Sequence, residues 1–146
     1  MSVHLIFEFL TAFVGTIAFA LLFQVPKEYY VNCGLAGGCG WICYKLLLAG
    51  CGLFGSTFFA TVLVVFLSRL SAVRRHCPVT IFLVAGIFPL VPGVAFTNGI
   101  RDIADQDYIA GAVRMLDALL VTFSIAMGVG LVMIGYHHFV GGAILP

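Results

Sequence analysis

Long apolar stretches dominate this chain, and short runs of polar or turn-forming residues separate them. Five apolar segments result, at residues 3–23, 31–48, 53–67, 79–96 and 110–136. The first would rise about 32 Å as an α-helix, enough to cross the roughly 30 Å hydrocarbon core of a bilayer. The pattern predicts an all-α polytopic membrane protein of about five transmembrane helices, with residues 1–146 forming a single transmembrane domain.

The fourth segment contains two prolines, Pro89 and Pro92, and Gly93 directly follows the second. A proline has no amide hydrogen, and its ring clashes with the preceding helical turn. The carbonyls of Ala85 and Phe88 would then lose their usual helical donors, which costs several kcal/mol each in hydrocarbon. We therefore expect the fourth helix to be broken at Pro89 and Pro92, where protein, water or a ligand meets the freed groups.

Four polar residues follow the expected break, and their spacing places them on one helical face. Asn98, Arg101, Asp102 and Asp105 lie at offsets of 0, 3, 4 and 7, which fit the helical repeat. A broken membrane helix that leads to a polar face is typical of a solute pathway. The alternative is an ordinary proline kink beside a solvated loop, and the four polar side chains favour the pathway.

The fifth segment carries an ionisable pair within its apolar sequence. Arg114 and Asp117 are three residues apart, and Ser124 lies on the same stripe. A buried Arg–Asp pair often only holds helices together, and its net stabilisation can be near zero. Ionisable groups inside a span nevertheless favour a functional interpretation. Asp105 and Asp117 are candidates for proton coupling, because removing a carboxylate from water favours its protonated form.

Two other charged residues lie near the ends of predicted spans. Glu8 is close to the start of the first segment, and Lys45 is close to the end of the second. Both side chains can reach the interface by snorkelling. We therefore expect each to be a satisfied interfacial residue without a further role.

Small residues predict where helices pack closely in lipid. Gly34 and Gly38 form a small-xxx-small face in the second segment, and Gly128, Gly130 and Gly135 provide another in the fifth. The third segment is instead dense in Phe and Val. We expect this third segment to face lipid.

A cationic cluster of Arg69, Arg74 and Arg75 separates the third segment from the fourth. Short loops that are rich in arginine stay in the cytoplasm. The cluster predicts a cytoplasmic loop at residues 69–78, an N-terminus outside the cell and a cytoplasmic C-terminus. We expect a multi-pass protein of the plasma (inner) membrane, in contact with the lipid bilayer, with residues 98–107 directed outward.

Composition narrows the class of protein further. Charged residues make up 9% of the chain and the mean hydropathy is +1.17, which is typical of integral membrane proteins. The net charge of +1 argues against nucleic acid as a partner. No G-x-x-x-x-G-K-[ST], H-E-x-x-H or G-x-S-x-G sequence occurs. We therefore expect no ATP-driven transport by this chain, no enzymatic activity and no cofactor.

The five cysteines contain no C-x-x-C pair. Cys39 and Cys43 are four residues apart and would share a helical face, which permits a metal or thiol site. Cysteine also packs as a small apolar residue, and we expect that role and no metal. The four histidines fall at predicted span ends and not in one cluster.

Three runs of residues resemble the bacterial threonine/serine exporter family. They are F-Q-V-P at 23–26, S-T-F-F-A at 56–60 and, above all, F-L-V-A-G-I-F-P-L-V-P-G at 82–93. The likeness covers nearly the whole chain and is to the family's small-subunit form, equivalent to the C-terminal half of longer members. N-G-I-R-D at 98–102 and G-A-V-R at 111–114 also look like the family's larger half, as descent of both halves from one duplicated unit would produce.

The resemblance implies secondary export of small hydrophilic metabolites, such as threonine and serine, or dicarboxylates such as succinate in related two-subunit members. We expect a subunit or half of a transporter driven by the proton motive force. In this hypothesis the substrate pathway contains Pro89, Pro92, Gly93, Asn98, Arg101 and Asp102, and proton coupling or ion pairing involves Asp105, Arg114 and Asp117. The main alternative is a non-transporting membrane subunit that stabilises or regulates a partner transporter.

The predicted topology also implies a partner. Five spans leave the two termini on opposite sides of the membrane, so a duplicated copy joined in sequence must insert upside down. Such inverted pairs bind the solute at their interface, with a broken helix from each half. This chain supplies one half, and we expect a second multi-span subunit of the same family, or a homo-oligomer, to supply the other.

Overall fold

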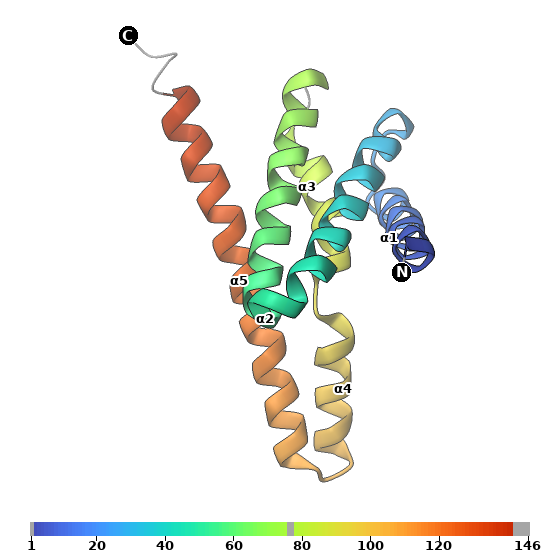
Figure 1. Cartoon of the computed structure of the whole chain (residues 1–146), viewed down its shortest axis with the longest axis vertical. Coiled ribbons are helices and arrows are strands. Elements are labelled where there is room, and N and C mark those ends of the chain that lie inside the picture. Colours follow the sequence, from blue (N-terminus) through green and yellow to red (C-terminus); the bar gives the residue numbers. More distant parts are fainter. Residues whose placement is uncertain (1, 76–77, 142–146) are drawn as a thin grey trace.

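Every regular element that the structure describes is helical (Figure 1). The structure is a computed structural model, and it describes residues 2–75 and 78–141. In chain order the elements are α1 (Ser2–Leu22), the 3-10 turn η1 (Lys27–Tyr29), α2 (Tyr30–Arg75), α3 (Val79–Ile87), the 3-10 turn η2 (Phe88–Leu90), α4 (Gly93–Ala104) and α5 (Tyr108–Gly141). The all-α fold that the apolar pattern predicts is confirmed.

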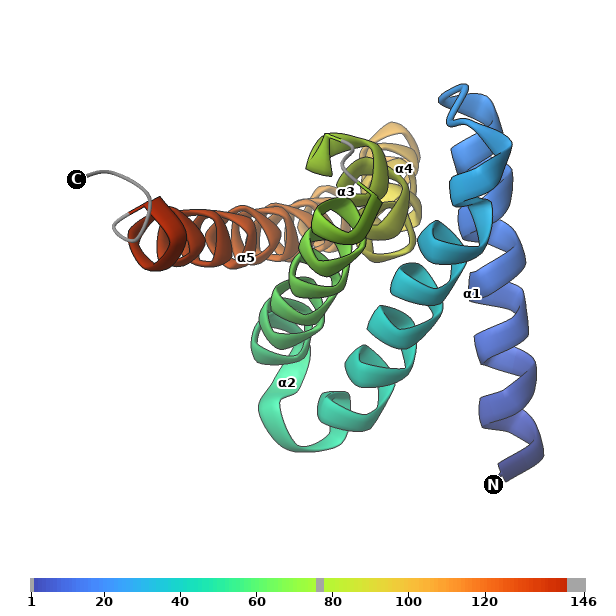
Figure 2. The ribbon, with the colours of Figure 1, turned by 90° about the horizontal axis from the view of Figure 1, so that it is seen from above.

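Helix α2 is folded back on itself. Its 46 residues would extend about 69 Å as one straight helix. Gly52, however, has φ 67° and ψ −176°, a backbone conformation that glycine adopts at little steric cost. The chain reverses there, and Figure 2 shows the two halves running back from the turn. We call residues 30–51 the first arm and residues 53–75 the second arm.

Three helices are long and apolar enough to cross a membrane when α2 is counted once. A fourth is added if α3 and α4, which are bent by 47° relative to one another, form a single span. The expectation of about five spans counts the two arms of α2 separately. That count stays a prediction.

The second arm of α2 lies at the centre of the fold. Val64 is fully buried and packs with Leu90 of η2 and Val121 of α5. This segment therefore buries one face in the fold, while Phe54, Phe59 and Phe66 stay exposed, and its contact with lipid stays a prediction. Its Phe and Val residues accompany a stripe of small hydroxyl residues, such as Thr61, whose hydroxyl donates to the Thr57 carbonyl at 2.8 Å. The buried Ser56 and Thr57 hydroxyls are paired within the same helix in the same way, whereas the buried Ser68 hydroxyl has no partner among the described residues.

Glycines allow α1 to approach the first arm closely. A Cβ atom on Gly34 would lie 2.7 Å from Phe13 Cε2, and one on Gly38 would lie 2.7 Å from Phe9 Cε2. Both distances are too short for a real side chain, so packing against α1 requires glycine at both positions. The small-xxx-small face of the second predicted segment is thus occupied by α1.

The glycines of α5 differ from one another in what covers them. A Cβ atom on Gly128 would lie 3.0 Å from Thr61 Cβ on the second arm, whereas nothing lies within 4 Å of Gly130 or Gly135. The Ser124 hydroxyl also donates to the Phe54 carbonyl of the second arm at 2.8 Å. Within the described residues, α5 therefore uses only part of its small-residue face.

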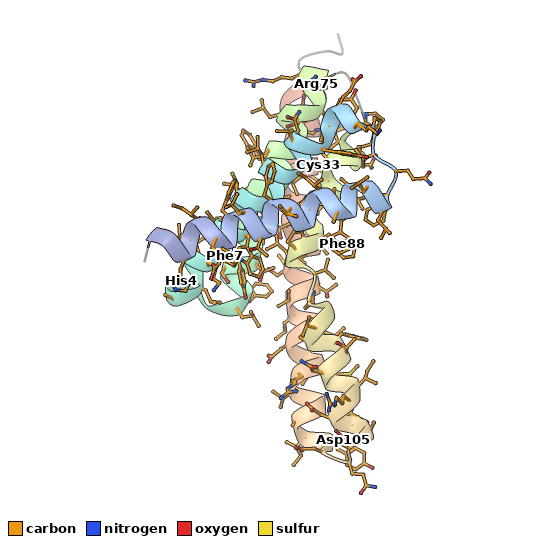
Figure 3. The ribbon with its side chains drawn as sticks, turned by 90° about the vertical axis from the view of Figure 1, so that its right-hand side faces the viewer. His4, Phe7, Cys33, Arg75, Phe88 and Asp105 are labelled. Carbon is orange, nitrogen blue, oxygen red and sulfur yellow. The ribbon has the colours of Figure 1, made fainter. Side chains whose placement is uncertain are left out.

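Helix α4 and the first turns of α5 form a hairpin, residues 93–117, that projects from the rest of the molecule (Figures 1 and 3). Asp105 marks its tip in Figure 3. Gly99 and Gly111 bring the two helices together, because a Cβ atom on Gly111 would lie 2.9 Å from the Gly99 carbonyl oxygen. The outside of the hairpin is apolar and open, with Val113 53% and Ile109 81% exposed.

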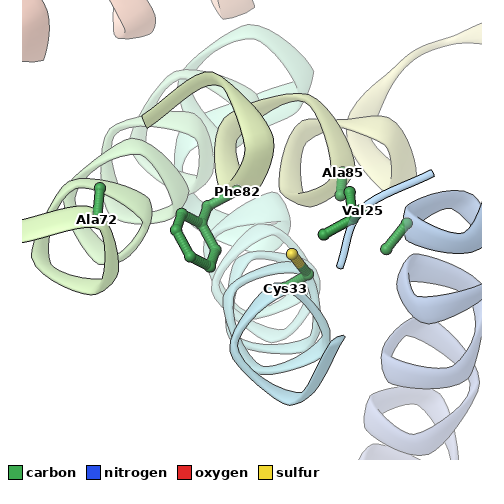
Figure 4. Close-up of a cluster of buried hydrophobic side chains, with 6 residues drawn as sticks. Val25, Cys33, Ala72, Phe82 and Ala85 are labelled. Carbon is green, nitrogen blue, oxygen red and sulfur yellow. The ribbon is translucent and has the colours of Figure 1, made fainter. Parts of the chain in front are cut away.

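A small buried core joins α1, the two arms of α2, and α3 (Figure 4). Its members are Ala20, Val25, Cys33, Ala72, Phe82 and Ala85. Phe82 is the largest of them, and the Tyr29 ring meets its ring edge-on with centroids 5.3 Å apart. This core fixes α3, and with it the start of the broken segment, against the first two helices.

The cationic cluster lies on a helix and not in a loop, because α2 continues to Arg75. The predicted loop at residues 69–78 therefore begins too early, and His76 and Cys77 lie outside the described residues. The Arg69 guanidinium carbon lies 4.0 Å from the centre of the Tyr136 ring on α5. The start of α2, its end and the end of α5 all lie in the upper part of Figure 1, above the turn between the two arms, but apart from one another. Which of these ends faces the cytoplasm stays a prediction.

Candidate solute-binding site

The fourth predicted segment is divided by a short link between α3 and α4. Val91 is extended, with φ −67° and ψ 127°, and its amide donates to the Phe88 carbonyl at 3.1 Å. The Phe88 carbonyl thus lacks its usual helical donor at Pro92, as expected, and the amide of the 3-10 turn meets it instead. Pro92 precedes α4, and its carbonyl accepts a hydrogen bond from the Phe96 amide at 3.0 Å.

A cavity of about 300 Å³ lies beside this link, at the lower end of the roughly 300–1,000 Å³ range of ligand pockets. It is lined by Trp41, Tyr44, Leu53 and Thr57 of α2, by Pro89, Leu90, Val91 and Pro92, by Val94 and Ala95 of α4, and by Asp117, Ala118 and Val121 of α5. Most of this wall is aromatic or aliphatic. Asp117 is the only charged group among the described residues that line it.

The N-terminus of α4 opens into the same cavity. Val94 and Ala95 line it and belong to the first turn of α4. The amides of Gly93 and Phe96 donate to the Val91 and Pro92 carbonyls, whereas those of Val94 and Ala95 have no backbone acceptor among the described residues. These free donors and the helix dipole give this end of α4 a partial positive charge. The cavity therefore combines N–H donors on one side with the Asp117 carboxylate on another, a combination that suits a solute bearing both charges.

Asp117 and Arg114 do not pair with each other as the sequence suggests. Arg114 Nη1 lies 2.8 Å from Asp102 Oδ2, so the ion pair joins α5 to α4 across the hairpin. Asp117 has no ion-pair partner among the described residues. The local spacing of three residues permits a contact, but the close approach of α4 at Gly99 offers Arg114 a nearer carboxylate.

The remaining predicted residues lie along the hairpin and away from the cavity. Asn98, Arg101 and Asp105 are exposed, and Arg101 Nε lies 3.9 Å from Asp105 Oδ2 with both side chains largely in the open. Gly93 starts α4 beside the link and is also exposed. The structure thus brings Pro89, Pro92 and Asp117 together, and it does not bring Asn98 or Arg101 into their cavity.

A second cavity, of about 460 Å³, lies between α1 and the first arm. It is lined by Phe7, Glu8, Thr11, Ala12, Gly15 and Phe19 of α1, by Trp41 and Lys45 of the first arm, and by Pro89. Lys45 Nζ lies 2.9 Å from Glu8 Oε1. The two residues therefore satisfy each other, and the position of the pair at the membrane interface stays a prediction. They are 37 positions apart, so no local pattern could reveal the contact.

Metal binding finds no support in the described part of the chain, where no group of three or more His, Cys, Asp or Glu residues could hold an ion. Cys39 and Cys43 are partly buried on the first arm. Cys33, one of the core residues, shows that cysteine is used here for packing.

Comparison with known proteins identifies the family. The profile of the family described as "Threonine/Serine exporter, ThrE" matches residues 8–134. The chain belongs to the threonine/serine exporter family. This assignment confirms the resemblance carried by the proline–glycine run at residues 82–93, and the long apolar helices fit a membrane protein.

Two curated relatives extend beyond the matched region. A "Probable threonine/serine exporter" of Mycobacterium tuberculosis is 30% identical over 113 residues, which are 74% of this chain and 20% of the relative. An "Uncharacterized protein" of Haemophilus influenzae is 33% identical over 91 residues, 62% of this chain and 31% of the relative. The aligned part of the chain thus spans between a fifth and a third of these relatives' lengths. No solved structure matches the chain.

Proposed function

We propose that this chain is one half of a secondary exporter of small zwitterionic amino acids of the threonine and serine type. The observation that carries the proposal is the cavity beside the broken helix, where Asp117 and the first turn of α4 line one space. Family membership supports the solute class, because the relative from Mycobacterium tuberculosis is described as a probable threonine/serine exporter.

The chemistry of the cavity suits such a solute. The ammonium group of an amino acid would pair with the Asp117 carboxylate, and its carboxylate would accept hydrogen bonds from the free amides of Val94 and Ala95. The Trp41 and Tyr44 rings, whose centroids are 5.5 Å apart, would exclude water and strengthen both contacts. A dicarboxylate such as succinate would meet repulsion from Asp117, so we propose amino acids as the preferred substrates.

We further propose that export is driven by the proton motive force through Asp117. A carboxylate that binds either a proton or the ammonium group of the solute couples the two, because it cannot hold both at once. Asp117 has no competing cation among the described residues. In contrast, Asp102 is held by Arg114, and Asp105 lies at the exposed tip of the hairpin.

A second half is required to close the cavity. The hairpin exposes apolar side chains on its outer side, and Gly130 and Gly135 have open space above them. Close-packing faces that remain unfilled in one unit favour another helical partner. We propose that this partner is a second multi-span subunit of the same family or a second copy of the chain, inserted so that the two broken helices face each other.

Reconstitution tests the function. The protein is purified from its native membrane with any subunit that remains bound, and liposomes containing it are loaded with labelled threonine. An outward flux that follows an imposed proton gradient, exceeds that of protein-free liposomes and is competed by serine more than by succinate supports the proposal. A preparation that binds its partner but moves none of these solutes would favour the non-transporting subunit.

A further inference from the structure

The second cavity shares two of its walls with the first. Trp41 and Pro89 line both, so the two spaces adjoin at these residues. The second space runs along α1 from Phe7 to Phe19, about 18 Å at the helical rise. The Glu8–Lys45 pair lies towards one end of this groove, and the broken helix meets it at Pro89.

The ion pair is not needed to hold α1 in place. The α1 helix is already fitted against Gly34 and Gly38 by Phe13 and Phe9. The Glu8 and Lys45 side chains are 31% and 40% exposed, and ion pairs of that kind add only about 0–1 kcal/mol to stability. Charges within apolar spans are costly and mark solute or ion pathways. The pair therefore calls for a functional explanation.

We propose that Glu8 and Lys45 form a second binding subsite for the zwitterionic solute, separate from the cavity that contains Asp117. The solute carboxylate would contact Lys45 Nζ, and its ammonium group would contact Glu8 Oε1. In the empty state the two side chains satisfy each other at 2.9 Å. A solute with both charges can replace both halves of that pair, so neither residue is left unpaired when the solute binds.

This inference rests on the proposed function and adds a second solute-binding step to it. The N-terminal end of α1, which carries Glu8, and the turn between the two arms of α2 lie at the same end of the fold, at the bottom of Figure 2. A solute bound by the pair would thus be held close to this end of the fold. Trp41 and Pro89 lie where this space adjoins the Asp117 cavity.

A subsite formed by Glu8 and Lys45 would discriminate between solutes by their charged groups, which a purely structural ion pair would not do. Threonine amide has no carboxylate, so it leaves the Lys45 ammonium without a counter-charge. The corresponding hydroxy acid has no ammonium group, so it leaves Glu8 unpaired. Losing one hydrogen bond to a charged group weakens binding about tenfold or more. We expect both analogues to compete poorly with threonine at this subsite.

Equilibrium binding of labelled threonine tests the subsite in an Asp117→Asn background, in which the first cavity lacks its carboxylate. The protein is purified from its native membrane with any bound subunit and placed in lipid nanodiscs. Glu8→Gln, Lys45→Gln and the double variant are compared with Glu28→Gln and Lys27→Gln, which make the same charge changes in the exposed η1 turn. The double variant leaves no unpaired charge and so controls for misfolding.

We expect threonine binding to persist after Asp117→Asn and to weaken about tenfold or more in each single variant and in the double variant. Glu8→Gln should lose discrimination against the hydroxy acid, and Lys45→Gln should lose discrimination against the amide. The two η1 controls should bind normally. No residual binding in the Asp117→Asn protein, or normal binding by the folded double variant, would overturn the subsite.

The two proposals fail in different ways. If the unsubstituted protein exports threonine from liposomes while the Glu8 and Lys45 variants bind and export normally, the function stands and the subsite is wrong. If the charge-dependent binding is found but no preparation moves solute, the subsite stands and the export function is wrong.

Discussion

The body of the molecule, formed by α1, α2 and α3, and the α4–α5 hairpin use the same kinds of residues in different ways. In the body, Gly34 and Gly38 let aromatic side chains of α1 fill the interface, and Val64 and Phe82 are fully buried. In the hairpin, Gly99 and Gly111 bring two backbones together, while the apolar side chains around them point outward and stay exposed. Both regions expose apolar side chains, but the body also encloses a buried core, whereas only Gly99 and Gly111 are buried within the hairpin.

The ion pairs of the two regions also differ in what they contact. The hairpin has an ion pair, Arg114–Asp102, that ties its two helices together. The body has one, Glu8–Lys45, that lies in a cavity between helices already held by packing. Asp117 stands where the two regions meet and pairs with no cation among the described residues. Under the proposed function, the hairpin pair has a structural role, whereas Asp117 and the Glu8–Lys45 pair bind the solute.

The largest loss of threonine export is expected when Asp117, at this junction, is substituted. Asp117→Asn keeps the shape of the side chain and removes its charge, so threonine export should fall about tenfold to a hundredfold, as expected for the loss of a hydrogen bond to a charged group. The dependence of export on the proton gradient should weaken as well. Initial efflux rates from liposomes measure both, with protein level checked by immunoblot. Normal gradient-dependent efflux in the variant would remove Asp117 from the mechanism.

Straightening the link between the regions should have the next largest effect. Replacing Pro89 and Pro92 with alanine restores two backbone donors, so α3 and α4 should join into a more continuous helix and narrow the cavity. We expect export to fall about tenfold, equivalent to ~1.4 kcal/mol, while the amount of protein in the membrane stays normal or rises. Export at the unsubstituted rate would mean that the prolines are only tolerated kinks.

The glycines provide a matched pair for the packing comparison. A methyl group on Gly111 would meet Ile103 and the Gly99 backbone, whereas one on Gly130 would meet open space. We expect Gly111→Ala to destabilise the protein by about 1 kcal/mol or more through overpacking. Gly130→Ala should stabilise the isolated chain by up to about 1 kcal/mol through helix propensity. Thermal unfolding in detergent measures both changes.

The same pair also reports on the partner. If another subunit covers Gly130, the added methyl group should weaken co-purification of that subunit even though the chain itself becomes more stable. Equal co-purification of the Gly130→Ala and unsubstituted proteins would place the partner elsewhere on the surface.

The smallest change in stability and solute binding is expected when the Arg114–Asp102 ion pair of the hairpin is removed. Arg114→Gln should reduce stability by less than about 1 kcal/mol, because the Arg114 side chain is half exposed and such pairs contribute little. Adding Asp102→Asn should restore part of that loss, since no unpaired carboxylate remains. Solute affinity should not change in either variant. A large loss of threonine binding with normal stability would instead make Arg114 a solute ligand.

The all-α fold could be predicted from the sequence because membrane helices must satisfy their own backbone, which makes long apolar runs reliable signals. The family could be predicted from the proline–glycine run at residues 82–93. The direction in which each helix packs could not be predicted, as the second arm of α2 shows. Its Phe and Val residues suggested lipid contact, but the hydroxyl residues between them turn its other face into the centre of the fold.

The site could be predicted only where its parts are close in sequence. Pro89 and Pro92 mark the link, and Asp117 is conspicuous as a charge within an apolar segment. The offsets that placed Asn98 and Arg101 on one face are correct for a helix, but they do not reveal which face meets the cavity. The Glu8–Lys45 contact depends on how α1 crosses the first arm, which is a tertiary property that no local spacing records.

The most direct test of the solute site is protection of a cysteine within it. Val94 lines the cavity and is 75% exposed, while Ile109 is 81% exposed on the same hairpin and does not line it. With the native cysteines replaced by alanine, Val94→Cys and Ile109→Cys proteins are treated with a thiol reagent, with and without threonine. Threonine should slow the reaction at position 94 and leave position 109 unchanged. Equal reaction rates at position 94 with and without threonine would contradict solute binding beside the broken helix.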